Sequence, residues 1–361
     1  MSAGRGEAFI LDWGVRRQLI AEFLSPSSTV PKLVFGCNRL AERISALVNI
    51  DGFIDDVIDS QTFAGMPVVR SFEIPLNAIV ISAIVGVAPI SVERELHRLG
   101  IAHVDYFAFI KESHLDLLPV PFWAGAHEES IDNLVEYETI LGRMQDEISH
   151  QTFKDVLDFR RTLDLNYMTQ YVNRQNEQYF ESFLQLESDN LSFYDLGCFD
   201  GFTSREFARL SPQYATISAF EPVPRLFETC VENLKHLPNC NVYNFGASDV
   251  QTQTSFTDNG SSSTANPVGE VSVTLKKLDD ENLPAPSLIK IDIEGAEIAA
   301  LTGMHRLLAA NRPKIAVACY HYASQVRELI HLWDSMELEG DIHFRHYTEG
   351  TTESVLFLCP K

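Results

Sequence analysis

The first third of the chain alternates short apolar segments with segments of helical periodicity. Apolar strands are predicted at residues 32–35, 52–54, 67–69, 79–84 and 104–109. A helix is predicted over residues 37–47, and a second is predicted to begin at Ser91, where an acidic first turn follows a good capping residue. Strands that alternate with helices in this way predict a parallel sheet.

The alternation stops at the segment PVPFWAG, residues 119–125, and resumes at Phe193. Such a break predicts a domain boundary. The residues that follow it are charged, nearly free of glycine and proline, and helical in pattern. We therefore expect an N-terminal Rossmann-like α/β domain over residues 1–125, a helical connector over 126–187 and a second α/β domain over 188–361.

One uncharged stretch, residues 74–92, approaches the length of a membrane-spanning helix. It is interrupted, however, by Pro75, Asn77, Gly86 and Pro89. A buried strand followed by a turn and a helix fits this pattern better, so no membrane span is expected.

The charge of the chain narrows its partners. The net charge of -22, from 28 basic and 50 acidic residues, disfavours binding to nucleic acid or to anionic membrane surfaces. The 6 cysteines have no CxxC spacing and no neighbouring histidine cluster, so they do not predict a zinc site. Together with the polar, charged N-terminus, they predict reduced thiols in a cytoplasmic protein.

The segment FYDLGCFDGFT, residues 193–203, is the most informative in the chain. An apolar strand is predicted to end at Asp195, and a helix is predicted from Thr203, with a glycine turn between them. Glycines allow a tight turn and a close approach of ligand to backbone, as in the first βα turn of a doubly wound sheet. The pattern is D-x-G-x-x-x-G rather than the dinucleotide fingerprint, and Asp195 suits the ammonium group of a methionine-type cofactor.

Three further acids follow predicted apolar strands. Glu221 suits the two hydroxyls of a ribose, and Asp249 suits the exocyclic amine of an adenine. Asp292 ends the buried segment LIKI. Each acid taken alone is also compatible with a solvated strand end or turn. Together with Asp195 they predict one ligand crevice at the carboxyl ends of the strands.

From about Gln178 to Leu358 the chain resembles the FkbM-type methyltransferases that use S-adenosylmethionine (SAM). The motifs that carry the resemblance are QYF (178–180), YDLG with DG (194–201), FEP (220–222), PKIA (313–316), RHY (345–347) and, most specific, IKIDIEGAE (289–297). The resemblance implies a class I fold, with a seven-stranded sheet whose last strand is antiparallel. It also implies O-methylation of sugar or polyketide hydroxyls and a link to polysaccharide biosynthesis. Cys198 and Phe199 depart from the commoner pattern, which leaves the shape of the methionine pocket open.

The motifs assign a set of residues to the cofactor. Tyr179, on a helix expected before the first strand, is predicted to close over the methionine end, with simple helix packing as the alternative. The full set predicted to bind SAM is Tyr179, Asp195, Gly197, Cys198, Phe199, Asp200, Gly201, Thr203, Glu221, Pro222, Ala247, Ser248, Asp249 and Asp292.

Methyl transfer to an alcohol benefits from a positioned base. His321, after the strand predicted at 315–319, is predicted to be that base or to contact the substrate, with a hydrogen-bonded core histidine as the alternative. Asp292 and Glu294 are the second candidate, as base or as a divalent-cation site, and Asp292 is the one predicted to be catalytic. Alternate residues on a strand point to opposite faces, so only one of the two faces the crevice if the strand continues through both. Glu294, Arg345 and His346 are predicted to bind the acceptor. No metal is expected to be required, because the sequence offers too few oxygen ligands.

The predicted function is SAM-dependent O-methylation of a sugar or glycan precursor, a nucleotide-linked one included. A polyketide or lipid-like alcohol as acceptor and a non-catalytic SAM-binding scaffold are the alternatives. In the N-terminal domain, the helix predicted to start after Gly36 suits the binding of a phosphate, and Asp55 suits the binding of a ribose or sugar hydroxyl. The alternative is a packing or dimerisation module that binds no ligand. The single glycine in this segment argues against a dehydrogenase. A homo-oligomer is left open.

Overall fold

The computed structural model describes residues 9–257, 264–265 and 271–361. It forms two compact units. The N-terminal unit comprises Met1–Asn133, Lys154–Arg174 and Tyr347–Thr352, and the C-terminal unit comprises Leu134–Phe153, Gln175–His346 and Glu353–Lys361. Residues 126–187, the predicted connector, thus contribute to both units, and the predicted domain limits stay predictions.

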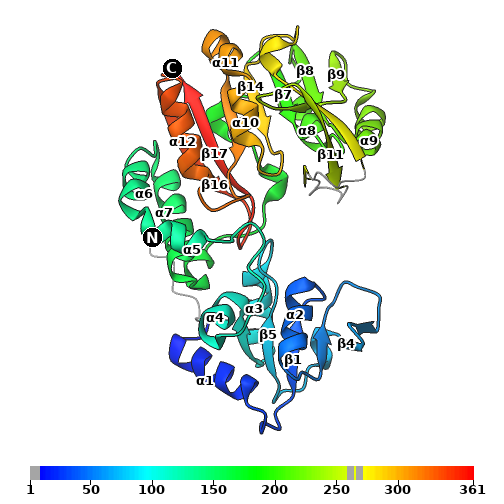
Figure 1. Ribbon diagram of the computed structural model, residues 1–361, viewed down its shortest axis with the longest axis vertical. Helices are drawn as coiled ribbons and strands as arrows, with labels where there is room; N and C mark the ends of the chain where they lie inside the picture. The colour runs from blue at the N-terminus through cyan, green and yellow to red at the C-terminus, as the bar shows by residue number, and fades with distance from the viewer. Residues whose placement is uncertain (1–8, 258–263, 266–270) are drawn as a thin grey trace. The chain divides into compact units, whose positions relative to one another are not determined.

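The N-terminal unit is built on a six-stranded sheet in the order β3-β4-β2-β1-β5-β6 (Figure 1). All neighbouring strands are parallel except β3 and β4, as the alternation of strands and helices predicts. The strands are β1 (Lys32–Phe35), β2 (Gly52–Ile54), β3 (Thr62–Phe63), β4 (Met66–Val69), β5 (Ile79–Ser82) and β6 (Ala102–Asp105). The helices are α1 (Trp13–Leu24), α2 (Arg39–Leu47), η1 (Ser71–Glu73), α3 (Pro89–Arg98), α4 (Tyr106–Ser113) and α5 (Ala126–Asp132).

Two predictions for this unit were wrong in detail. Helix α3 begins at Pro89 rather than Ser91, because proline fits the first turn of a helix. The Ser91 backbone and hydroxyl groups donate to Glu349 at 2.7 and 2.6 Å. The strand predicted at 104–109 ends at Asp105, whose carboxylate accepts from the Ala108 backbone at 2.9 Å and caps α4. An apolar run alone does not distinguish a buried strand from a buried helix.

The C-terminal unit contains a seven-stranded sheet in the order β16-β17-β15-β14-β7-β8-β9 (Figure 1). Strand β17 is antiparallel to both neighbours and the other pairings are parallel, which confirms the predicted class I sheet. The strands are β7 (Ser192–Leu196), β8 (Thr216–Phe220), β9 (Cys240–Tyr243), β14 (Leu288–Ile291), β15 (Lys314–Ala318), β16 (Gly340–His346) and β17 (Ser354–Pro360).

The remaining elements of this unit connect and cover the strands. A small sheet has the order β10-β13-β11-β12. Its strands are β10 (Gly246–Ala247), β11 (Thr252–Thr257), β12 (Thr264–Ala265) and β13 (Val271–Lys276). The helices are α6 (Leu134–Leu141), η3 (Gln175–Glu177), η4 (Ser182–Leu184), α8 (Phe202–Leu210), α9 (Pro224–Leu234), η6 (Leu278–Asp280), α10 (Glu297–Thr302), α11 (His305–Asn311) and α12 (Gln325–Ser335). Helix α7 (Glu147–Thr162) has residues in both units, and η2 (Leu165–Met168) belongs to the N-terminal unit.

Tyr179 was predicted to lie on a helix, and this is wrong. Helix η3 ends at Glu177, and Tyr179 has a left-handed φ of 73°. Among the residues that the structure describes, no helix combines the length and apolar character needed to cross a membrane.

Strand order places the site in this unit. Strands β8 and β9 follow β7 on one side, whereas β14 and β15 lie on the other side. The chain therefore reverses direction across the sheet between β7 and β14. In doubly wound sheets a crevice opens at the carboxyl ends of the strands at this point, where ligands bind.

A buried lysine joins these two strands. Lys290 lies opposite Asp195 in the register of β14 and β7, with 3.2 Å between Nζ and Oδ1. Its Nζ also donates to the carbonyl oxygens of Leu196 and Gly197 at 3.2 and 2.6 Å. Asp195 accepts a further hydrogen bond from the Ser204 hydroxyl at 2.7 Å. Lys290 thus holds the turn after β7 against β14, with its charge compensated.

We predict that Lys290→Met destabilises the C-terminal unit by about 3–5 kcal/mol, because it leaves the Asp195 carboxylate buried without its cation. Native-state hydrogen exchange of the β7 and β14 amides measures this local free energy of unfolding. Lys276→Met is the matched control, since Lys276 pairs with Glu281 at a partly exposed site and exposed pairs contribute only about 0–1 kcal/mol. Equal losses in the two variants would contradict the assigned role.

Candidate cofactor and acceptor site

Two cavities meet at the carboxyl ends of the C-terminal strands. The first has a volume of about 300 Å³ and lies between the turn after β7, the end of β8, residues 246–248 and the turn after β14. The second has a volume of about 460 Å³ and lies between residues 175–180, the turn after β7 and the end of β14. The residues that line both are Gly197, Phe199, Asp292 and Glu294.

Most of the predicted cofactor residues line these cavities. Those lining one or both are Tyr179, Gly197, Cys198, Phe199, Asp200, Thr203, Glu221, Pro222, Ala247, Ser248 and Asp292. Asp195, Gly201 and Asp249 line neither. Asp195 is fully buried, so its carboxylate serves Lys290 and Ser204, and its contact with a cofactor ammonium group stays a prediction.

Glu221 is the acid of the first cavity. Its carboxylate accepts from the backbone amides of Val223 and Phe199 at 2.9 and 3.2 Å. Burial raises the pKa of Glu221 to about 7, against the effect of these two hydrogen bonds. The surrounding walls are mainly apolar and include Phe220 and Leu226. A carboxylate beside apolar walls suits a ligand with both hydroxyls and a flat ring.

The turn after β7 requires its first glycine. Gly197 has a φ of 78°, and a Cβ atom there would lie 1.9 Å from the Asp292 carbonyl oxygen. Any side chain would therefore push β7 and the turn after β14 apart. Behind this turn, the Cys198 sulfur lies 3.1 Å from the sulfur of Cys230, and both thiols are free.

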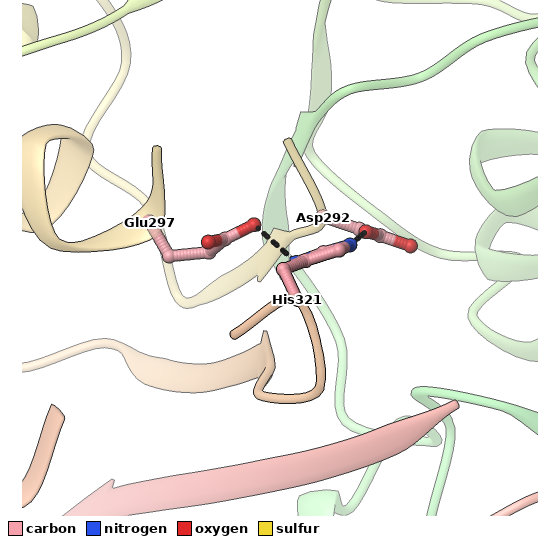
Figure 2. Close-up of side chains that lie close together, drawn as sticks. All are labelled: Asp292, Glu297 and His321. Carbon is pink, nitrogen blue, oxygen red and sulfur yellow. Dashed lines mark ion pairs between the residues drawn. The ribbon is translucent and has the colours of Figure 1, made fainter. Parts of the chain in front are cut away.

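His321 lies between two carboxylates, as Figure 2 shows. Its Nε2 is 3.3 Å from Asp292 Oδ1 and its Nδ1 is 3.1 Å from Glu297 Oε1. Burial lowers the pKa of His321, but hydrogen bonds to Asp292 and Glu297, with their charges, outweigh burial and raise it to about 10. His321 is 2% exposed and lines neither cavity. At neutral pH it is therefore an imidazolium, which has no free site for a proton.

Asp292 is the charged counterpart of His321. Burial opposes its ionisation, but the hydrogen bond from His321 and the charges of Lys290 and His321 lower the pKa of Asp292 to about 2. The Tyr179 hydroxyl also donates to Asp292 Oδ2 at 2.7 Å. Asp292 therefore remains a carboxylate at neutral pH, facing both cavities.

Glu297 was missed as a site residue from the sequence, where it appears only as the last residue of the motif IKIDIEGAE. It is fully buried, and its Oε1 accepts from the backbone amides of Ile293 and Gly295 at 3.0 and 3.2 Å. Its Oε2 accepts from Gln325 Nε2 at 2.6 Å, while Gln325 Oε1 accepts from the His321 backbone at 2.8 Å. Glu297 thus connects the turn after β14 with the loop that carries His321.

Asp292, Glu297 and His321 are also the one group among the described residues whose potential metal-ligand atoms lie within 4.8 Å of one another. The ion pairs and backbone hydrogen bonds above account for this closeness without a metal. Glu297 Oε1, in particular, already accepts two amide protons. That no metal is required stays a prediction.

Two more acids lie beside this group. Burial raises the pKa of Glu294 and of Glu353 to about 7. Glu353 accepts from Gln178 Nε2 at 2.8 Å and from the Tyr320 hydroxyl at 3.4 Å. Left-handed φ values occur at Tyr179, Phe199, Glu294 and Glu353. Such backbone strain, about 1–3 kcal/mol per residue, gathers at functional sites.

The structure does not bring Arg345 and His346 to the cavities. Arg345 lies 2.9 Å from Asp146 and donates to the Ser149 hydroxyl at 2.6 Å. His346 Nδ1 is 2.9 Å from the Ser354 hydroxyl. Both side chains are buried on β16 and line neither cavity, and their contact with an acceptor stays a prediction.

In the N-terminal unit the two groups predicted to bind a ligand, the helix start after Gly36 and Asp55, already have partners within the chain. At the helix start, Asn38 accepts from the Leu40 and Ala41 amides of α2. Asp55 accepts from the backbone amides of Cys37 and Val57 at 3.2 and 2.8 Å. These contacts explain both residues by local folding, and a ligand of this unit stays a prediction.

Comparison with known proteins relates the C-terminal unit to a methyltransferase family. Residues 195–344 match the family model described as "Methyltransferase FkbM domain". The chain is 29% identical to 2-O-methyltransferase NoeI of Sinorhizobium fredii (strain NBRC 101917 / NGR234), over 35% of this chain and 63% of that protein. It thus spans less than two thirds of this relative. The crystal structure of Methyltransferase FkbM from Methylobacillus flagellatus KT has the same fold, with a TM-score of 0.75, 18% identity, and coverage of 97% of this chain and 94% of that one.

Residues 195–344 therefore match an FkbM methyltransferase domain, as the motifs predicted. The match supports SAM as the cofactor of this domain, in agreement with the cavities at the end of β7 and β14.

We predict that the His321 imidazole stays protonated from pH 6 to pH 8, because its two carboxylates hold the pKa at about 10. Histidine-selective NMR measures this, and His321→Gln assigns the signal. Since the folded pKa lies above the unfolded value, this group contributes stability that is present below about pH 6.5 and is lost as pH rises through about 10. A titration midpoint near or below 6.5 would contradict the charge assignment.

Proposed function

We propose that this protein is a SAM-dependent O-methyltransferase that acts on a hydroxyl group of a sugar or glycan precursor. The observation that carries the proposal is the pair of cavities that share Asp292 and Glu294, at the carboxyl ends of β7 and β14, where the strand order reverses. When bound, SAM supplies the methyl group on a positively charged sulfur.

The residues of the two cavities fit the two ends of SAM. In this proposal Glu221 accepts hydrogen bonds from the ribose hydroxyls, and the adenine ring lies against the apolar walls of the first cavity, which Glu221 also lines. The second cavity offers polar side chains to the amino-acid end, namely Gln175, Asn176, Gln178, Asp200 and Thr203. The acids that line both cavities, Asp292 and Glu294, favour a cation at the junction.

A polyhydroxylated acceptor fits the outer part of the second cavity. Phe199 and Phe202 are 40% and 45% exposed there, beside amide and carboxylate side chains. Aromatic rings contact the apolar faces of a sugar, while amides and carboxylates pair with its hydroxyls. The name of the relative NoeI, a 2-O-methyltransferase, supports oxygen as the acceptor atom.

Asp292 and His321 are proposed to act as one unit. Asp292 presents a carboxylate to the positively charged end of SAM at the junction, and His321 keeps Asp292 ionised and oriented from behind. The carboxylate thereby helps to hold the methyl group in line with the acceptor oxygen, which is the main contribution a protein makes to an in-line transfer.

We predict that calorimetric titration with SAM shows one saturable site and that Glu221→Ala weakens binding about 10-fold or more, because hydrogen bonds to a charged acceptor contribute about 1.5–3 kcal/mol each. Glu228→Ala, an exposed change on the neighbouring helix α9, is the matched control and keeps the affinity of the wild type. Radiolabelled SAM with a panel of neutral methyl glycosides then tests O-methylation. The absence of SAM binding by the wild-type protein would contradict the proposal.

A further inference from the structure

We propose that Glu294 is the proton acceptor of the reaction and that Glu297 is the positioning residue that holds the turn presenting it. This inference rests on the proposed function and deepens it, since it assigns the base that His321, an imidazolium, does not supply.

Glu294 occupies the junction of the two cavities. Among the described carboxylates, only Asp292 and Glu294 line both. Asp292 is already paired with His321 and accepts from Tyr179. Glu294 Oε2, in contrast, is a buried atom that has no hydrogen-bond partner among the described residues and lies 3.7 Å from His321 Nε2, while the Glu294 side chain as a whole is 15% exposed. Of these two carboxylates, Glu294 is therefore the one with an oxygen that no hydrogen bond already engages.

The backbone of Glu294 adopts a strained conformation that neighbouring hydrogen bonds hold in place. Its φ of 57° is a left-handed conformation that side chains other than glycine rarely adopt. Glu297 Oε1 accepts from the amides on either side of it, those of Ile293 and Gly295. Glu297 thus fixes the turn at two points around Glu294, and Gln325 fixes Glu297 in turn.

The surroundings tune Glu294 for proton transfer near neutral pH. Burial raises the pKa of Glu294 to about 7, the charge of His321 opposes this, and Asp292, Glu297 and Glu353 reinforce it. A base works best when its pKa lies near the working pH. As the acceptor oxygen bonds to the methyl carbon, its hydroxyl proton passes to Glu294, and the electron pair of the broken carbon–sulfur bond stays on sulfur.

A proton-linkage measurement tests the position of Glu294 without any acceptor. The positive charge of SAM at the junction favours the Glu294 carboxylate, so binding at pH 7 releases protons. S-adenosylhomocysteine is the reference ligand, because it has the same ribose as SAM but an uncharged sulfur. We expect calorimetry in buffers of different ionisation enthalpy to show a larger release for SAM than for S-adenosylhomocysteine.

Two variants identify the residue that causes the larger proton release with SAM. Glu294→Gln is expected to abolish it, whereas Glu353→Gln keeps it, because Glu353 has a similarly raised pKa but lines neither cavity. The same SAM-specific release in Glu294→Gln would overturn the inference. Failure of the wild type to bind SAM would instead overturn the proposed function, so the two failures are distinguishable.

Kinetics test the chemical role. We expect Glu294→Gln to lower kcat at least about 100-fold with little change in SAM affinity, and to remove the rise of rate with pH near 7. Glu294→Gly guards against misfolding, since glycine adopts this φ without strain, and it is expected to be equally inactive. A kcat within about threefold of the wild type in either variant would overturn the assignment.

The positioning role of Glu297 has its own readout. In Glu297→Gln a negative charge that disfavours ionisation of Glu294 is lost, while His321 stays paired with Asp292. The rise of rate with pH is then expected at lower pH, with a lower kcat and an unchanged SAM affinity. Adding Gln325→Glu restores an acceptor for the new amide and is expected to recover kcat. An unshifted pH profile, or no recovery in the double variant, would overturn this role.

Discussion

The ammonium group of Lys290 lies near the carboxyl ends of the neighbouring strands β7 and β14, beside the Asp195 carboxylate and two backbone carbonyl oxygens. It pairs with Asp195 and donates hydrogen bonds to the carbonyl oxygens of Leu196, at the end of β7, and of Gly197, in the turn that follows. Without this cation, the turn would lose its anchor and the buried acid its partner. The close approach of Gly197 to the Asp292 carbonyl oxygen depends on the same arrangement.

The rest of the site follows from an excess of buried acids over cations. His321 compensates Asp292 and Glu297, which leaves Glu294 and Glu353 with raised pKa values. A cavity with such surplus negative charge favours a ligand that brings a positive charge. This is the electrostatic reason why a sulfonium cofactor fits the junction, and why a carboxylate there is ready to take up a proton.

The sequence predicted the sheet, the glycine turn and the position of Glu221 directly after β8, because these depend on local pattern and on the order of strands. The role of Asp195 was not predictable, because it depends on Lys290, which lies 94 and 93 positions along the chain from Leu196 and Gly197 and meets them only through strand register. Lys290 does stand out as a charge within the apolar segment LIKI, and this irregularity was the available signal. His321 was taken as a base from the ordinary pKa of histidine, whereas its two buried carboxylates reverse that expectation. Glu297 had no distinguishing pattern, since its partners are backbone amides.

A crystal structure of the protein with S-adenosylhomocysteine tests the central claim most directly, that the two cavities are one cofactor site joined at Asp292 and Glu294. The account predicts the ribose hydroxyls on Glu221, the adenine ring beside Ala247 and Ser248, and the sulfur between the two cavities, facing Glu294. A ligand bound elsewhere, or one whose sulfur faces away from Glu294 with the ribose off Glu221, would contradict it.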